Sequence, residues 1–569
     1  MKRLWLYELQ LRTKRNVGRS PTRQASPVSN EYEVIAVSRI VYEPLSSRRA
    51  FAMSWKQEVA ELERRLGLVQ QMGGEESVNF HHGRGKLTVR ERIEALQDPG
   101  TFREIGALAG TPVFDENGLL ESLTPANYVI GTAELDGRRA VLCGGDFTIR
   151  GGAGDGNIGQ KYIVAEKLAR DHRMPLIRLL DATGGSVKTF EKLGHTYLPD
   201  IESPDLSTEI LSQVPVVSAV LGSVAGLPAI QACLSHFSIM VKDTSQVFVA
   251  GPAVVKEGVG IDITKEDLGD ERVQIPNGVI DNLAENEQDA FEQTRRFLSY
   301  LPSNVWEMAP RSEPKDPVGR REEMLLEVIP RIKRRIYYPH KILDAVLDID
   351  SFFEIAPLSG RAHITGLGRV DGYPVGVMIN NPLYYGGAMG PLEAEKAMRL
   401  VQLCDTFHLP LVWLCDEPGF HVGPENEAQG ILRGGARALT VFSASKMPYI
   451  SFLMRQCYGV AGGLHVRHSG MYQRYAWPSA HAGSMHIEGG TMVAYKREIQ
   501  NAEDPKAKRE EIEARLEAIA SPFRNAHAMD IENLIDPRET RPLLCEFVQQ
   551  AQTILKTQLG PTAGASFRP

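Results

Sequence analysis

The chain has 569 residues, more than the roughly 250–300 that one hydrophobic core organises, so we expect two to four domains. Its formal net charge of −7 is small for this length and gives no reason to expect a nucleic-acid partner. No stretch approaches the run of about 18 apolar residues that a membrane-spanning helix needs, so a membrane link would require another subunit. The six cysteines form no C-x-x-C pair, which argues against a zinc ribbon and a disulfide scaffold. We therefore expect reduced thiols and no metal site in this chain.

The first 52 residues differ in composition from the rest. They are rich in Arg and Ser and contain Pro21 and Pro27. An Arg-rich start is typical of a transit peptide, but acidic residues such as Glu8 and Glu31 argue against one. Helical periodicity begins only at Met53. We interpret residues 1–52 as a disordered leader or an over-long start. The expected localisation is cytoplasmic, or mitochondrial if the leader is a transit peptide.

The next elements follow in chain order. Thr88 and Glu91 have the spacing of a capping box, which predicts a helix that starts there. A strand, a Gly-rich loop, a helix and a buried strand come next, and a D-x-x-G turn and a third strand follow. These elements are expected at residues 140–143, 151–156, 160–171, 175–180, 181–184 and 214–220.

The same order returns after residues 310–318, a charged and Pro-rich segment that we interpret as a linker between domains at 53–309 and 319–569. The second set of strands is expected at 375–379, 410–415 and 447–453, and its helix at 392–406. A charged, mostly helical stretch at 503–517 is expected near the C-terminus. Strands that alternate with helices imply a largely parallel sheet, and short apolar runs without alternation fit strands covered on both faces.

The two series of strands and helices are copies of one internal repeat. Six features recur at an offset of 235 residues without a gap. They are Gly131 and Gly366, Asp136-Gly137 and Asp371-Gly372, residues 151–153 and 386–388, Pro175-Leu176 and Pro410-Leu411, Asp181 and Asp416, and Gly184 and Gly419. The chain therefore contains two copies of one fold.

Small-residue turns after strands are the most informative chemical feature. They let a ligand approach the backbone, and the free N–H groups of a helix that starts there favour negative charge. Two such amides aimed at one oxygen make an oxyanion hole. The alternative is that these are ordinary strand-to-helix turns, but their presence in both copies argues against it. Residues 151–156 (GGAGDG) lack the spacing of a dinucleotide loop. Lys396 to Leu400 lies in a repeated helix, and Arg399 replaces the lysine of a biotinylation site, so we interpret it as core packing.

Several segments together resemble one family. Residues 83–93 (GRGKLTVRERI) and 236–252 (HFSIMVKDTSQVFVAGP) are similar to N-terminal motifs of the carboxyltransferase (β) subunits of biotin-dependent acyl-CoA carboxylases. Residues 415–420 (CDEPGF), 431–436 (ILRGGA) and 476–480 (AWPSA) resemble their C-terminal motifs. Residues 215–227 resemble the second oxyanion loop of the crotonase superfamily. The resemblance covers about residues 53–569 and implies an α/β fold of two tandem crotonase-like domains with ββα-superhelix cores.

The resemblance also implies a mechanism and partners. Carboxybiotin carried on a separate subunit releases CO₂, the biotin N1 takes the α-proton of an acyl-CoA, and the enolate attacks CO₂. Oxyanions on the thioester and on the ureido group each require a hole. The implied partners are a biotin carboxylase and a biotin carboxyl carrier subunit. The family's site lies between the N-half of one subunit and the C-half of another, which implies a homo-oligomer, usually a hexamer, with neither nucleic acid nor membrane.

The site residues implied by position fall into two groups. The catalytic backbone donors are Gly226, Leu227, Gly459, Val460 and Ala461. The substrate-binding candidates are Arg84, Lys86, Ala153, Gly154, Gly184, Gly185, Ala388, Gly419 and Gly463. Arg84 and Lys86 are expected at the phosphates of CoA, and ordinary surface charge is the alternative.

The chain departs from the family at several of these positions. Leu227 and Val460 replace common glycines, Pro228 has no N–H, and Gly463 stands where many members have an acidic or larger residue near the acyl pocket. These departures leave the identity of the acyl group open, and propionyl-CoA is the candidate substrate. Two other functions stay open, a biotin-dependent acyl-CoA decarboxylase α-subunit and a non-catalytic scaffold subunit.

Overall fold

The computed structural model describes residues 54–569 apart from 198–201, 333–334, 466–469, 563–566 and 568. Residues 1–58 and residues 59–569 are separate units, and both large sheets lie in the second. The predicted leader and the predicted start at Met53 lie outside the described residues.

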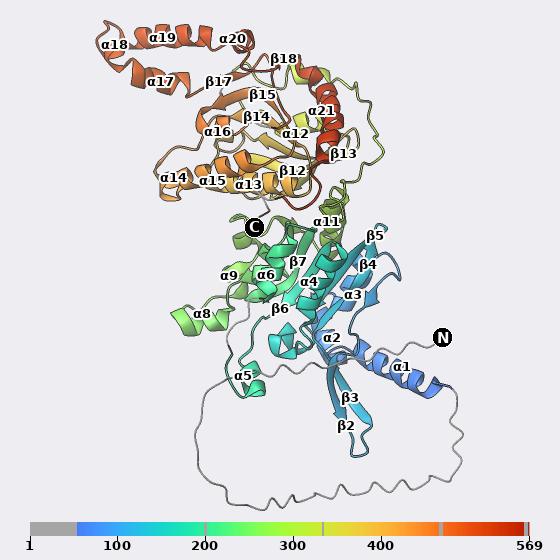
Figure 1. The fold of residues 1–569 in the computed structure, drawn as a ribbon. Helices are drawn as coiled ribbons and strands as arrows, with labels where there is room; N and C mark the ends of the chain where they lie inside the picture. The colour runs from blue at the N-terminus through green and yellow to red at the C-terminus, as the bar shows by residue number, and fades with distance from the viewer. Residues whose placement is uncertain (1–53, 198–201, 333–334, 466–469, 563–566, 568) are drawn as a thin grey trace, which may run out of the picture. The chain divides into compact units, whose positions relative to one another are not determined.

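Two eight-stranded sheets organise this unit (Figure 1). The strand order is β1-β4-β5-β6-β7-β8-β10 in the first sheet, with β9 beside β7, and β11-β12-β13-β14-β15-β16-β18 in the second, with β17 beside β15. The strands of the first sheet are β1 (Arg103–Glu104), β4 (Tyr128–Leu135), β5 (Arg138–Gly145), β6 (Leu176–Ala182), β7 (Val216–Ala225), β8 (Phe237–Val241), β9 (Gln246–Phe248) and β10 (Asn282–Ala284). Those of the second are β11 (Phe353–Ile355), β12 (His363–Val370), β13 (Tyr373–Asn380), β14 (Leu411–Glu417), β15 (Tyr449–Tyr458), β16 (Tyr472–Ala476), β17 (His481–Gly483) and β18 (Asn533–Leu534).

The first two strand pairings of each sheet are antiparallel and the others are parallel. A separate hairpin joins β2 (Gly110–Phe114) and β3 (Leu120–Pro125). The predicted α/β class with two copies of one fold is therefore confirmed.

The helices alternate with the strands as predicted. They are α1 (Lys56–Gln70), α2 (Glu75–His82), α3 (Val89–Leu96), α4 (Lys161–His172), α5 (Lys188–Leu193), α6 (Glu202–Ile210), α7 (Leu227–Cys233), α8 (Pro252–Val259), α9 (Lys265–Gly269), α10 (Glu271–Gln274), α11 (Glu287–Ser299), α12 (Pro339–Val346), α13 (Pro391–Thr406), α14 (Pro424–Ala428), α15 (Ile431–Ala444), α16 (Gly459–Gly463), α17 (Ile487–Ala494), α18 (Lys496–Gln500), α19 (Pro505–Ile519), α20 (Pro522–His527) and α21 (Thr540–Leu555). The capping box of Thr88 and Glu91 begins α3, as predicted. The predicted linker at 310–318 lies between α11 and β11, and the domain boundaries placed there stay a prediction.

The repeat offset is the same for most of the sheet and then changes. β4, β5 and β6 precede β12, β13 and β14 by 235 residues, whereas β7 precedes β15 by 233. The connection between β14 and β15 is therefore two residues shorter than the connection between β6 and β7. Gly226 consequently corresponds to Gly459, and Leu227 corresponds to Val460.

Both faces of the second sheet are covered, which explains the continuous apolar run of β14. Val412 and Leu414 pack in one core with side chains of α12 and α21. Leu411 and Trp413 point the other way and pack in a core that includes α13 and α15. A strand buried on both sides has no polar face, so the alternation typical of a half-buried strand is absent from β14.

His236, which precedes β8, makes the fold sensitive to acid. Its Nδ1 accepts a hydrogen bond from the Val216 N–H at 3.0 Å, and its Nε2 lies 2.9 Å from the Leu211 carbonyl oxygen. Burial lowers the pKa of His236 to about 3. An unfolded histidine has a pKa of about 6.5. The stability contributed by the neutral ring is therefore complete above pH 6.5 and is lost as the pH falls towards 3.

We expect acidification from pH 7 to pH 5 to cost about 2 kcal/mol through this residue. His236→Gln does not titrate, so its melting temperature should fall less over this pH range than that of the wild type. The half-exposed His340, whose pKa is raised by its hydrogen bond to Glu354, gives the control variant His340→Gln. An equal acid-induced fall in the wild type and His236→Gln would contradict the assignment to His236.

Candidate active site

Three small-residue segments of the first copy meet at one end of the sheet. Gly154 donates its N–H to the carbonyl oxygen of Gly184 at 2.7 Å. Gly184 has φ 80°, and a Cβ built on it would lie 2.4 Å from the Ala225 carbonyl oxygen. Only glycine fits such an approach in this backbone region. The Gly-rich loop, the D-x-x-G turn and the end of β7 are thus in contact. The substrate-binding roles of Ala153, Gly154, Gly184 and Gly185 and the catalytic role of Gly226 stay predictions.

The second copy repeats these contacts at the corresponding positions. Met389, which follows Ala388, donates its N–H to the Gly419 carbonyl oxygen at 3.0 Å. A Cβ built on Gly419 would lie 3.5 Å from the carbonyl oxygen of Tyr458, the last residue of β15. The loop of Ala388, the turn of Gly419 and the turn of Gly459 therefore meet as in the first copy.

The turns after β7 and β15 each contain a glycine with a positive φ. Gly226 has φ 66° and Gly459 has φ 65°, and a short helix, α7 or α16, begins at each turn. The Gly226 N–H is already donated to the Val249 carbonyl oxygen at 3.2 Å. Leu227, at the first helical position, has no intrahelical acceptor for its N–H. Val460 occupies the matching position, and its side chain is 60% exposed.

Lys86 lies in the interior instead of at the surface. Only 7% of it is exposed, and its Nζ is 2.6 Å from Asp181 Oδ2. Arg92 shares this carboxylate at 3.1 Å and also pairs with Glu287 at 2.8 Å. Burial lowers the pKa of Lys86. This pairing argues against both sequence interpretations of Lys86, a phosphate contact and a free surface charge. Arg84 is exposed and lies over the Phe80 ring, with 4.3 Å from Cζ to the ring centroid.

The corresponding aspartate of the second copy is also paired. Asp416 Oδ2 lies 2.9 Å from Arg455 Nη2 and accepts a hydrogen bond from the Tyr337 hydroxyl at 2.9 Å. Burial raises the pKa of Asp416. Sequence reasoning found the repeated aspartates but missed these partners, because Arg455 and Tyr337 have no counterpart at the repeat offset.

A buried hydrogen-bond network supports the second D-x-x-G turn. Gly419 donates its N–H to Glu417 Oε1 at 3.0 Å. The other carboxylate oxygen, Oε2, lies 2.9 Å from His363 Nε2 and accepts from Asn380 at 3.0 Å. Ala182 stands at the position of Glu417 in the first copy, so this support is specific to the second copy. Sequence reasoning missed it, although an acidic residue at the end of an apolar strand was a signal.

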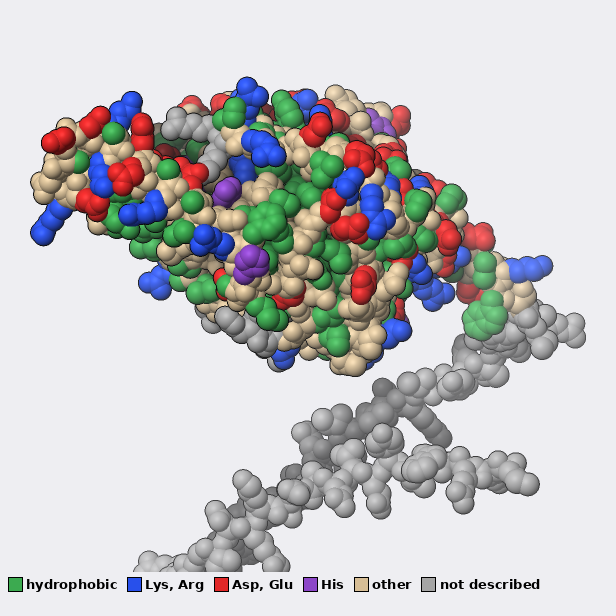
Figure 2. Space-filling view, turned by 90° about the horizontal axis from the view of Figure 1, so that it is seen from above, with side chains coloured by type: hydrophobic (Ala, Val, Ile, Leu, Met, Phe, Trp, Pro, Cys, Tyr) green, Lys and Arg blue, Asp and Glu red, His purple; other side chains and the backbone are tan. Residues whose placement is uncertain are grey.

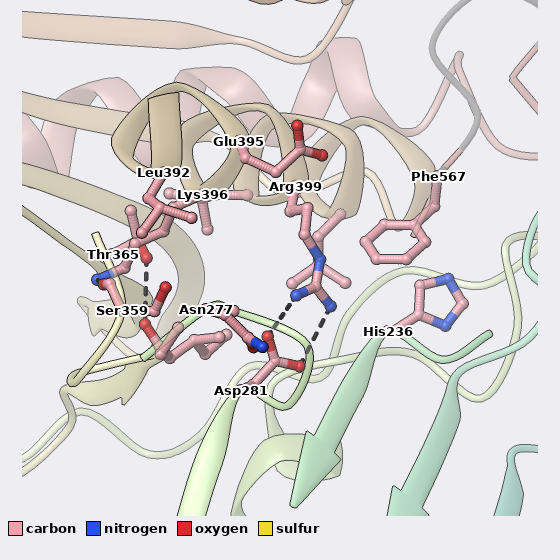
Figure 3. A pocket seen from close by; sticks show the side chains of 15 residues that line it. His236, Asn277, Asp281, Ser359, Thr365, Leu392, Glu395, Lys396, Arg399 and Phe567 are labelled. Atoms are coloured by element: carbon pink, nitrogen blue, oxygen red, sulfur yellow. Dashed lines mark hydrogen bonds and ion pairs between the residues drawn. The ribbon is translucent and has the colours of Figure 1, made fainter. Parts of the chain in front are cut away.

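A pocket elsewhere is lined by residues of both copies (Figure 3). The Asp281–Arg399 ion pair, with 2.5 Å between Oδ1 and Nη1, crosses it, and Phe567 and His236 lie beside it. Lys396 donates to the carbonyl oxygens of Ser359 at 3.1 Å and His363 at 2.8 Å. The predicted core role of residues 396–400 is thereby confirmed, and none of the predicted site residues lines this pocket.

Comparisons with known proteins identify the family. The model of the carboxyl transferase domain matches residues 80–558. The chain belongs to the carboxyl transferase family. The carboxyltransferase subunit of propionyl-CoA carboxylase from Haloferax mediterranei is 33% identical over 511 residues, which cover 89% of this chain and 98% of that one. The methylmalonyl-CoA decarboxylase subunit alpha from Veillonella parvula is 30% identical over 487 residues, 84% of this chain and 93% of that one.

Solved structures agree with the family and with the fold. Transcarboxylase 12S, described as a hexamer with methylmalonyl-coenzyme A bound, aligns with a TM-score of 0.80 at 28% identity, covering 88% of this carboxyltransferase and 96% of that chain. The predicted resemblance and the two tandem crotonase-like domains are therefore confirmed. The chain is a carboxyltransferase of the biotin-dependent acyl-CoA carboxylase family. Among the described residues, no helix is long and apolar enough to cross a membrane.

Proposed function

We propose that this carboxyltransferase moves a carboxyl group from carboxybiotin to the α-carbon of an acyl-CoA through an enolate, with propionyl-CoA as the first substrate to test. The observation that supports the proposal is the pair of matched turns, Gly226-Leu227 and Gly459-Val460, each of which has a glycine with a φ near +65° at the start of a short helix. Two oxygens carry developing negative charge in this reaction, the thioester oxygen and the ureido oxygen. Two copies of one turn suit two such oxygens.

The chain's own contribution is backbone hydrogen bonding. Bound carboxybiotin supplies the carboxyl group and the base for the α-proton. The N–H groups of Leu227 and Val460 lie in the first turns of α7 and α16, where the helix offers them no acceptor. Ala461 stands next to Val460 as a second donor candidate. Fixed donors of this kind stabilise an oxyanion without reorganisation during the reaction.

The proposed assembly is a homo-oligomer, a hexamer in the family, in which the N-terminal copy of one subunit faces the C-terminal copy of another. Apolar side chains near the turns support it, because Ile230, Val249 and Val460 are 53%, 89% and 60% exposed. Biotin carboxylase and biotin carboxyl carrier subunits are the proposed partners, and the proposed localisation is cytoplasmic. Charges of both signs are interspersed on the face in Figure 2, as expected for a net charge of −7.

A second candidate is the reverse direction, decarboxylation of an acyl-CoA. The similarity to the Veillonella parvula decarboxylase subunit supports this second candidate, because carboxylation and decarboxylation pass through the same enolate. A net rate measured with intact partner subunits distinguishes the directions.

The test of the proposed function is decarboxylation of methylmalonyl-CoA and malonyl-CoA by the purified oligomer, with and without free biotin. Biotin-dependent loss of CO₂ is the expected result. A folded oligomer that binds CoA esters but decarboxylates none of them would support the scaffold alternative.

Gly463 gives a prediction about the acyl group. A Cβ built on Gly463 meets no atom within 4 Å, so a side chain can begin there without a clash at Cβ. If Gly463 borders the acyl pocket, Gly463→Leu should lower kcat/KM for longer acyl-CoA esters about 10- to 100-fold relative to acetyl-CoA. Acetyl-CoA, measured with the same preparation, is the internal control. An equal change for all chain lengths would remove Gly463 from the pocket.

A further inference from the structure

Two thiols and an imidazole converge below the turn at Gly459. Cys415 lies on β14, Cys457 lies on β15, and His465 follows α16. All three are buried, and one possible ligand atom from each lies within 4.8 Å of the others. In the part of the chain that the structure describes, no other three His, Cys, Asp or Glu side chains converge in this way. We call these three residues the thiol cluster.

The spacing of Cys457 and His465 suits a tetrahedral cation. Ligands of a tetrahedral zinc site lie about 3.6 Å apart for sulfur to nitrogen and about 3.8 Å apart for sulfur to sulfur. Cys457 Sγ lies 3.5 Å from His465 Nδ1 and 3.7 Å from Nε2. No backbone movement is therefore needed to bring this pair to ligand distance.

The imidazole has an additional contact that is common in metal sites. His465 Nδ1 contacts the Gly462 carbonyl oxygen, and a carbonyl only accepts, so Nδ1 carries the proton. In the neutral ring Nε2 is then the nitrogen without a proton, the one that can bind a metal, and the hydrogen bond fixes the orientation of the ring.

We propose that Cys415, Cys457 and His465 bind one soft divalent cation of the zinc type. Two thiolates and an imidazole are the ligands that such a cation prefers. Binding releases the thiol protons to solvent and leaves a neutral bis-thiolate complex in the interior. The cation connects β14, β15 and the segment that follows α16, and so holds the turn that contains Val460. This inference reverses the expectation of no metal site.

Cobalt(II) titration of the reduced, metal-free full-length oligomer tests the proposal without relying on carboxyltransfer. We expect one cobalt ion per chain, with thiolate-to-cobalt charge-transfer absorption and tetrahedral d–d bands. The Trp413 ring centroid lies 6.2 Å from that of His465, so cobalt should also quench its fluorescence. Zinc should displace the cobalt and raise the melting temperature.

Cys415→Ser, Cys457→Ser and His465→Gln should each lower the affinity for cobalt at least 10-fold. Cys545→Ser is the matched control, because Cys545 is also buried but lies on α21, outside the thiol cluster. No charge-transfer band in the wild type, or the same band in all three variants, would overturn the proposal. A Cys415–Cys457 disulfide whose reduction restores no cobalt binding would overturn it too. If a variant does not assemble, the wild-type protein alone provides the test. A wild-type melting temperature that is the same with and without saturating zinc would also overturn the proposal.

Discussion

Val460→Pro is expected to lower the rate of biotin-dependent methylmalonyl-CoA decarboxylation by about 10²–10³ while the oligomer stays folded. Proline removes the backbone N–H that we propose as an oxyanion donor. It fits the first turn of a helix, where that N–H has no intrahelical partner. The preceding residue, Gly459, has no Cβ to clash with the proline ring.

The matched control is Val460→Ala, which shortens the same side chain but keeps the N–H. Its rate should stay within a few-fold of the wild type. Oligomeric state and circular dichroism of both variants confirm that the fold is retained. A folded Val460→Pro variant with a nearly normal rate would exclude this amide as a donor and leave Ala461 as the candidate in the second copy.

Asp181→Asn is expected to destabilise the first copy by about 3–5 kcal/mol and to lower the melting temperature by about 5 °C. The substitution keeps the shape of the side chain but removes the charge that Lys86 and Arg92 share at 2.6 and 3.1 Å. Glu287 is then left to balance two buried cations. Removing one partner from a buried ion cluster destabilises the protein by more than the intact cluster stabilises it. The reason is that the remaining charges are left buried, desolvated and uncompensated.

Asp136→Asn is the control, since Asp136 also pairs with an arginine, Arg295, at 2.7 Å, but its side chain is 66% exposed. Solvent screens such a pair, so a loss below about 1 kcal/mol is expected. Equal melting temperatures for the two variants would show that Lys86 loses its proton at little cost, or that the network rearranges.

The duplication could be predicted from sequence because both copies need the same glycines at the same places. Gly184 and Gly419 follow equivalent strands, and the space beside Gly184 accepts no side chain. The change of offset from 235 to 233 residues was not predicted. It falls in a connection between strands, where length is free to vary because the strand ends are fixed by the sheet.

The charged residues were harder to place. Lys86 was expected at a phosphate, since a lysine in a basic segment is usually solvated. The structure pairs it with Asp181, 95 positions later in the chain, which the sequence placed in the turn after a buried strand and which forms part of β6. A sequence does not show which buried carboxylate a distant lysine meets, because that depends on how helices and strands pack.

The sequence by itself determined the family, the duplicated α/β fold and the small-residue turns, because glycine positions and apolar strands are local requirements of the backbone. Only the tertiary structure decided which groups meet across strands. Cys415, Cys457 and His465 form no ligand motif in the sequence, yet adjacent parallel strands and the short helix α16 bring them within 4.8 Å. Neighbouring strands are separated by a whole helical connection in the chain but by about 5 Å in the sheet, so spatial clusters of this kind have no spacing signature.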